Sequence, residues 1–172
     1  MADKYLYRDA STGLVTQREA TTTGGSPAQA GDILALGSDG RISSTVLPVG
    51  IGEDVQSLPA GESLSGGDFV YITSAGEVMR ASAGVTGTEA IGFVLASYVT
   101  GAQALVYFEG RNTGLTGLTA GARYYLSDTI PGGIIATPLA DTVGNVGKKH
   151  QFIGRAINTT SLSFEPAEPI VL

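Results

Sequence analysis

The sequence predicts an all-β protein, a compact β-barrel or sandwich made of two pseudo-repeated units and preceded by an extended N-terminal arm. Three observations predict it. The chain of 172 residues contains 25 glycines, and only 15% of its residues are charged. Short apolar runs alternate with glycine-rich turns. The second half of the chain also repeats itself. This composition favours strands joined by many turns over a bundle of helices.

The internal repeat keeps the order of its apolar segments, while the loops between them differ in length. The matching segments are 64–72 (LSGGDFVYI) with 118–126 (LTAGARYYL), 90–94 (AIGFV) with 152–156 (FIGRA), and Phe108-Glu109 with Phe164-Glu165. One unit of this size cannot bury its own apolar face, whereas two packed units can. We therefore expect one duplicated β domain over residues 53–172, with repeat one at about 60–110 and repeat two at about 114–166.

Four hairpins are expected within this domain, because each pair of strand-like runs flanks a turn that contains glycine or asparagine. The pairs are 68–73 with 77–81, 90–99 with 102–109, 123–126 with 133–136, and 151–157 with 162–165. Continuous apolar runs such as residues 69–72 indicate strands covered on both faces. Residues 53–172 are enough for a substantial core.

Residues 1–52 differ from the rest and cannot form a core of their own. Residues 21–27 (TTTGGSP) interrupt any regular element, residues 32–36 resemble a short strand, and Asp39-Gly40 favours a tight turn. A disordered tail and an arm that orders on a partner chain are both consistent with this pattern. We prefer the arm, because its apolar side chains would otherwise face water. They define the candidate interface: Ile33, Leu34, Leu36, Ile42, Val46, Leu47 and Pro48.

Charge and composition argue against several classes of partner. The formal net charge is −6, and Lys148-Lys149 is the densest basic point. Affinity for nucleic acid and for anionic membranes comes largely from Lys and Arg, so we expect neither partner. The N-terminal residues lack the apolar core of a signal peptide, and the longest apolar stretch, near residues 91–99, is too short to span a bilayer. We expect a protein made in the cytoplasm.

No catalytic, cofactor or metal site is expected. The chain has no cysteine and a single histidine, His150, which follows two lysines in an expected loop. The acidic residues are scattered, and residues 144–149 (GNVGKK) lack the full phosphate-loop pattern. Glu109 and Glu165 are interpreted as solvated acids at strand ends. Core packing is the default role of Tyr71, Tyr107, Tyr124 and Tyr125, and a platform for stacking carbohydrate is the alternative.

Two segments carry a family resemblance. Residues 36–48 (LGSDGRISSTVLP) resemble the L-D-x-x-G-[KR]-[IL]-x-x-S-x-L-P segment of many tailed-phage fibre and structural proteins, which often lies where three chains meet. Residues 64–110 are similar to small β domains of phage head decoration (cement) proteins. The resemblance implies a homotrimer on the virion, at the capsid exterior, that binds the major capsid protein. It implies no catalytic residue.

Two other functions are also consistent with parts of the sequence. A tail-fibre or baseplate component involved in host attachment would also fit the Leu47-Pro48 motif. A small phage hydrolase or lyase would need a catalytic constellation that the sequence does not display. The sequence therefore favours a structural virion protein made in the host cytoplasm.

Overall fold

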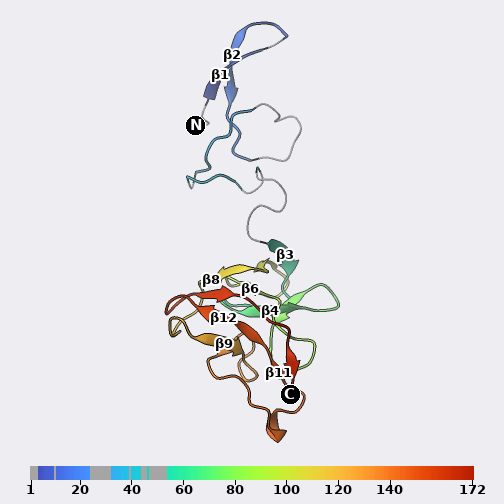
Figure 1. The fold of residues 1–172 in the computed structure, drawn as a ribbon. Coiled ribbons are helices and arrows are strands. Elements are labelled where there is room, and N and C mark those ends of the chain that lie inside the picture. The colour runs from blue at the N-terminus through green and yellow to red at the C-terminus, as the bar shows by residue number, and fades with distance from the viewer. Residues whose placement is uncertain (1–3, 10, 24–31, 39, 44–45, 47–53) are drawn as a thin grey trace. The chain divides into compact units, whose positions relative to one another are not determined.

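The computed structural model describes residues 4–9, 11–23, 32–38, 40–43, 46 and 54–172. The chain divides into two compact units, residues 1–52 and residues 53–172. Figure 1 shows the elements of each unit.

The first unit contains a β-hairpin that the sequence analysis does not predict. β1 (Lys4–Arg8) pairs antiparallel with β2 (Val15–Glu19). The Asp9 carboxylate accepts hydrogen bonds from the backbone N–H groups of Ser11 (2.8 Å) and Thr12 (3.0 Å), and this Asx turn begins the connection. The described part of the expected extended arm is therefore folded back on itself at its start.

Asp32 attaches the following segment to the hairpin. Its carboxylate forms an ion pair with Arg18 (2.8 Å) and accepts a hydrogen bond from the Thr21 hydroxyl (3.0 Å). The backbone N–H of Thr21 donates to the carbonyl of Ile33 at 2.9 Å, and an isolated parallel bridge joins Thr21 to Leu34. The expected tight turn follows, because the Gly40 N–H donates to Gly37 at 2.9 Å with a left-handed φ of 73°.

The second unit contains two five-stranded antiparallel sheets. The first sheet consists of β3 (Val55–Pro59), β4 (Phe69–Ile72), β5 (Val78–Arg80), β6 (Gly92–Val94) and β7 (Gln103–Tyr107). The second consists of β8 (Gly110–Asn112), β9 (Arg123–Leu126), β10 (Ile134–Ile135), β12 (Phe152–Ala156) and β13 (Leu162–Phe164). All four expected strand pairings form, as β4–β5, β6–β7, β9–β10 and β12–β13. The strand expected over 90–99 is shorter than predicted, because Tyr98 forms a bridge with Leu64 instead.

The two sheets have the same strand order and the same register. The first runs β3-β7-β6-β4-β5, and the second runs β8-β13-β12-β9-β10. Phe69 lies opposite Phe93 in the first sheet, as Arg123 lies opposite Arg155 in the second. Both sheets are open at their edges, so the described residues form a sandwich-like arrangement and not a closed barrel. The all-β prediction is confirmed.

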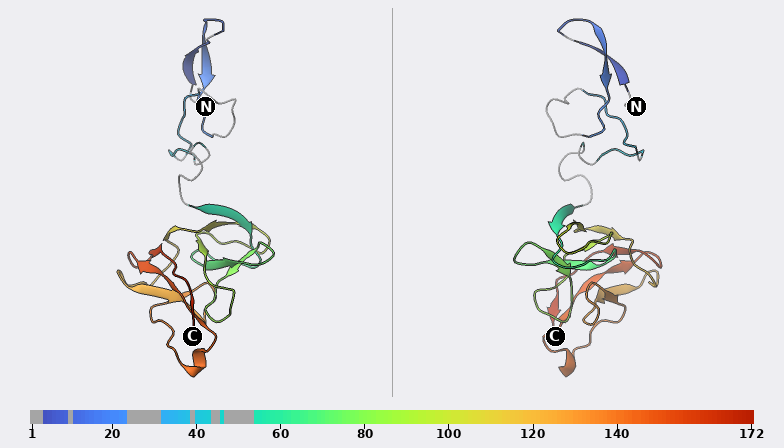
Figure 2. Two further views of the ribbon diagram at one scale, coloured as in Figure 1. Left: turned by 45° about the vertical axis from the view of Figure 1, so that its right-hand side comes forward. Right: turned by 180° about the vertical axis from the view of Figure 1, so that it is seen from behind.

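Short elements complete the second unit. A 3-10 helix spans Val143–Asn145, and β11 (Lys149–His150) pairs antiparallel with β14 (Ile170–Val171). In both views of Figure 2, the green strands of the first sheet lie beside the yellow-to-red strands of the second.

The main core lies between the two sheets, and it uses opposite faces of the two repeats. Phe69, Phe93 and Tyr107 belong to the first sheet's inner face. Their equivalents by register in the second sheet are Arg123, Arg155 and Ser163, which lie on its outer face. The inner face of the second sheet instead carries Tyr124, Leu126, Ile153, Ala156, Leu162 and Phe164.

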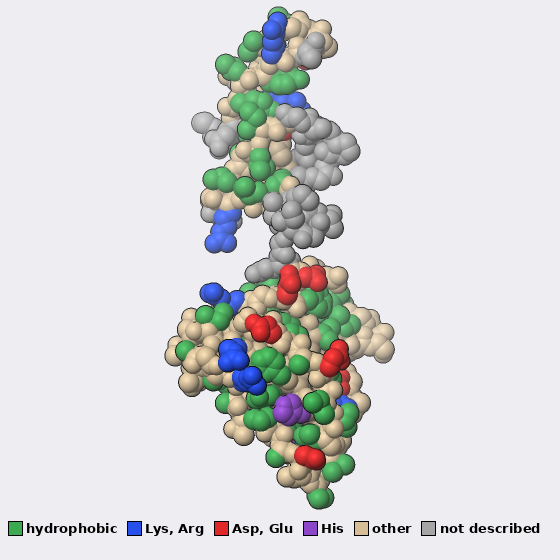
Figure 3. Space-filling model, viewed as in Figure 1, with side chains coloured by type: hydrophobic (Ala, Val, Ile, Leu, Met, Phe, Trp, Pro, Cys, Tyr) green, Lys and Arg blue, Asp and Glu red, His purple; other side chains and the backbone are tan. Residues whose placement is uncertain are grey.

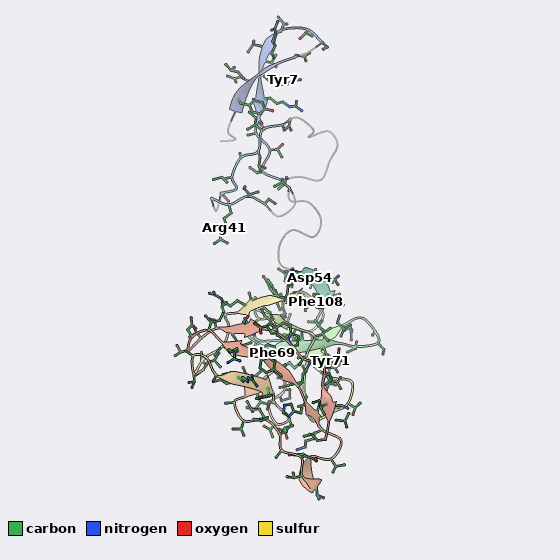
Figure 4. The ribbon with its side chains drawn as sticks, viewed as in Figure 1. Tyr7, Arg41, Asp54, Phe69, Tyr71 and Phe108 are labelled. Atoms are coloured by element: carbon green, nitrogen blue, oxygen red, sulfur yellow. The ribbon has the colours of Figure 1, made fainter. Side chains whose placement is uncertain are left out.

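Phe164 joins the two sheets. Its ring lies 5.7 Å from the ring of Phe69 and 5.4 Å from the ring of Phe93, with the second pair edge-to-face. Figure 4 shows Phe69 within the second unit. A second core on the other face of the first sheet contains Val70, Val94 and Val106, and it is covered by residues that include Leu64 and Tyr98.

Truncating Phe164 should destabilise the second unit strongly, because the ring fills the space between two aromatic side chains of the facing sheet. We expect Phe164→Ala to lower the free energy of unfolding by about 3–5 kcal/mol. Leu105→Ala is the control, since Leu105 is exposed on β7, and it should cost less than about 1 kcal/mol. Denaturant unfolding followed by circular dichroism measures both, and equal losses would contradict this packing.

Gly67 should tolerate no side chain, because the backbone of the second repeat's first loop passes directly over it. A Cβ at Gly67 would lie 2.5 Å from the Gly114 carbonyl oxygen, and φ is 101°. Gly76 also has a left-handed φ, of 79°, but a Cβ there would meet nothing within 4 Å. We expect Gly76→Ala to cost about 1 kcal/mol of conformational strain and Gly67→Ala to cost about 3 kcal/mol or more. Similar thermal midpoints for the two variants would contradict the close approach.

Candidate functional site

The structure leaves most of the predicted interface exposed. The side chains of Ile33, Leu36 and Ile42 are 54%, 57% and 50% exposed, and Leu34 is also exposed. Val46 is half-buried, whereas Leu47 and Pro48 lie outside the described residues. In residues 4–46, so far as they are described, no side chain is buried. The described part of this unit offers these apolar side chains no core to join, which favours a role in contact with another chain.

The turn at residues 37–41 brings part of this interface together. The Gly37 N–H donates to the Arg41 carbonyl at 2.8 Å, so Leu36 and Ile42 flank one turn. Leu6, Leu14 and Val15 on the hairpin are exposed as well. Figure 4 shows Tyr7 on this hairpin and Arg41 beyond it in the same unit. We call these exposed apolar side chains of the first unit the arm interface.

The outer face of the second sheet is a second candidate site, and the sequence analysis does not predict it. Arg111, Ser163, Arg155 and Arg123 lie opposite one another in that order across β8, β13, β12 and β9. Side chains directly opposite each other share a face of the sheet. Three arginines therefore lie in one cross-strand line, which we call the arginine row.

Aromatic side chains lie beside the arginine row. The ring of Tyr125 makes edge-to-face contacts with His150 at 4.9 Å and with Phe152 at 5.9 Å. A hollow of about 350 Å³ is lined by Arg123, Tyr125, His150, Phe152, Arg155 and Glu165. Figure 3 shows blue side chains over β9 and β12, with the purple histidine beside them.

The tyrosines, two glutamates and the histidine that the sequence analysis considered lie in different environments. Tyr124 is buried in the main core and Tyr107 stacks on Phe93 at 5.4 Å, which confirms core packing for both. Tyr125 is half-buried on the outer face instead. Glu109 and Glu165 are exposed, as expected. Among the described residues, His150 has a ring contact with Tyr125 and no side-chain hydrogen bond to a nucleophile.

A charged cluster lies at one end of the first sheet. Arg80 forms an ion pair with Glu62 at 2.9 Å, and this hydrogen bond lowers the pKa of Glu62 and raises the pKa of Arg80. Burial raises the pKa of Asp68, although its carboxylate accepts a hydrogen bond from the Ser65 N–H at 2.8 Å. The cluster connects the 60–68 loop to β5 and has a structural role.

The described residues contain no group of three or more His, Cys, Asp or Glu side chains that could hold a metal ion. Within the same residues, no helix is both long and apolar enough to cross a membrane. No protein-family model matches the chain, and no curated protein matches it either. The arm interface and the arginine row are the two candidate sites of the chain.

The Glu62–Arg80 pair predicts a small loss of stability in acid. The pKa of Glu62 is near 4.5 in the unfolded chain and lower in the native state. The ion pair therefore makes its full contribution to the unfolding free energy above about pH 4.5. This contribution decreases as the pH falls toward the lowered native pKa and is absent below it. We expect less than about 1 kcal/mol, since Arg80 is partly exposed.

Glu62→Gln tests this assignment. The difference in unfolding free energy between the native chain and Glu62→Gln should shrink as the pH falls from about 6 to about 3. The raised pKa of Asp68 changes the unfolding free energy with pH in the opposite direction. Both proteins contain Asp68, so this contribution largely cancels when the two are compared. A difference that stays constant over this pH range would contradict the ion-pair contribution.

Proposed function

We propose that the chain is a structural virion protein of a tailed phage, which binds the capsid exterior as a decoration (cement) protein and assembles as a homotrimer. The observation that supports it best is the arm interface, a set of exposed apolar side chains on a unit with no buried side chain among its described residues. Such a surface suits contact with the major capsid protein or with other copies of the chain. The resemblance of residues 36–48 to segments where three phage chains meet supports the same assembly.

Decoration accounts physically for the combination of an interactive arm and a stable β unit. A protein that binds the assembled shell and not the free subunits stabilises the shell by mass action. Three arms on one trimer make the attachment multivalent, so weak individual contacts suffice. A segment such as residues 32–36 can also add a strand to an exposed sheet edge of its partner.

A tail-fibre or baseplate component involved in host attachment is the second candidate. The exposed aromatic and arginine side chains around Tyr125 favour it, because a receptor-binding surface needs such groups. Antibody labelling of virions, from the phage that encodes the chain, distinguishes the two by electron microscopy. Label over the head supports decoration, label on the tail supports the second candidate, and unlabelled virions contradict both.

Serine substitutions in the arm interface should prevent assembly. We expect Ile33→Ser/Leu36→Ser/Ile42→Ser to sediment as a monomer or to lose co-sedimentation with phage heads, because three exposed apolar contacts are removed. Val99→Ser/Val143→Ser/Val146→Ser removes three exposed apolar side chains of the second unit and should leave both properties unchanged. A native chain that sediments as a monomer contradicts the homotrimer, and a triple arm variant that still assembles and binds heads contradicts the arm's role.

A further inference from the structure

The arginine row stands where the first repeat has a line of apolar side chains. In the first sheet the equivalent line is Val55, Tyr107, Phe93 and Phe69, in the same strand order. Those aromatic side chains pack against the second sheet. In the second sheet the equivalent positions hold Arg111, Ser163, Arg155 and Arg123. The second sheet thus has a polar, basic outer face at the positions where the first sheet has the apolar face that packs into the core.

This row carries an electrostatic cost that no ion pair among the described residues offsets. Arg123 and Arg155 lie directly opposite each other on adjacent strands, and like charges in that position are destabilising. Arg155 donates to the Gly121 carbonyl at 3.2 Å, but a neutral oxygen does not cancel the repulsion. Within residues 54–172, no carboxylate forms an ion pair with Arg111, Arg123 or Arg155. An external anion that bridges the guanidinium groups would relieve the repulsion.

The hollow beside the row has the right lining for a sugar ring. Tyr125 and Phe152 present half-buried aromatic surface, and His150 borders it. Exposed Glu165 lies on the same lining and accepts a hydrogen bond from the Ser163 hydroxyl at 2.9 Å. An aromatic surface packs against the C–H face of a sugar, guanidinium groups bind its carboxylate in a fork geometry, and a carboxylate accepts bonds from its hydroxyls.

We propose that the outer face of the second sheet binds an acidic polysaccharide whose sugar rings carry carboxylates. Arg123 and Arg155 hold one carboxylate, Tyr125 and Phe152 pack against the ring, and Glu165 accepts hydroxyl hydrogen bonds. Arg111 lies two strands from Arg155, about 10 Å away, and reaches the next acidic sugar of the same chain. This site is independent of the arm interface and of the proposed decoration role.

The position of the hollow favours a polysaccharide over an acidic peptide or a nucleic acid. β12 lies between β9 and β13, so a peptide cannot extend the sheet along this strand. Glu165 can accept hydrogen bonds from the hydroxyls that an acidic sugar carries beside its carboxylate, whereas a run of acidic side chains or a DNA backbone offers it no hydroxyl donor.

Binding of polygalacturonate to the full chain tests the proposal. At about 0.15 M salt, we expect calorimetry to show binding of polygalacturonate and no binding of neutral dextran. Arg123→Gln/Arg155→Gln should weaken binding about tenfold or more, because two charge-assisted contacts are lost. Lys4→Gln/Arg8→Gln removes the same charge from exposed positions of the first unit and should bind like the native chain. Circular dichroism establishes that each variant is folded.

A second variant distinguishes the contribution of aromatic packing to polysaccharide binding from the contribution of the arginine charges. Phe152→Ser keeps all three arginines, and it should weaken polygalacturonate binding while leaving any weak binding of polyglutamate unchanged. Four results would overturn the proposal: no binding of polygalacturonate by the native chain, equal binding of polyglutamate or DNA, equal losses in the two charge variants, or unchanged polygalacturonate binding by Phe152→Ser. Equal binding of polyglutamate would identify an acidic protein segment as the partner.

Discussion

The contact of Phe164 with Phe69 and Phe93 determines how the second unit is built. Phe164 comes from the inner face of the second sheet. Its two partners come from the inner face of the first sheet, which corresponds by register to the outer face of the second. The faces that meet are not equivalent by register, so the two repeats pack head-to-tail and not symmetrically. This arrangement needs an apolar surface on both faces of the first sheet but on only one face of the second. Loops of the first repeat cover the remaining apolar face through residues such as Leu64 and Tyr98.

Head-to-tail packing explains why the repeats differ most at particular positions. Val70 and Tyr124 occupy equivalent positions, and both are buried, because each lies in a covered face. Phe93 and Arg155 are also equivalent, but only Phe93 has a sheet packed against it. A large aromatic side chain at position 155 would remain exposed to solvent, since no layer of the described residues covers the outer face of the second sheet. The difference in sequence between the copies thus follows the difference in environment.

Much of the second unit could be predicted from the sequence, because its strands are short apolar runs between strong turn signals. The hairpin of 68–73 with 77–81 and its equivalent in the second repeat both form. The relative packing of the sheets could not be predicted, since both repeats show similar apolar runs. The arginine row could not be predicted either, because Arg111 and Arg155 are far apart in sequence. Only the strand register aligns them, each opposite Ser163. The hairpin of β1 and β2 lacks the glycine-rich two-residue turn that signals such pairs.

The two candidate sites differ in the kind of binding that their chemistry supports. Ile33 and Leu36 are exposed, and their contribution to binding comes from removing apolar surface from water. They therefore suit a contact that stays buried in an assembly. Arg123 and Arg155 remain solvated and meet a ligand through hydrogen bonds, which suits a weaker and reversible contact. The interior strands β9 and β12 hold these arginines on a rigid frame, which reduces the ordering cost of binding. If the arm interface assembles several chains, the weak sites are presented together, and their combined avidity exceeds that of any single site.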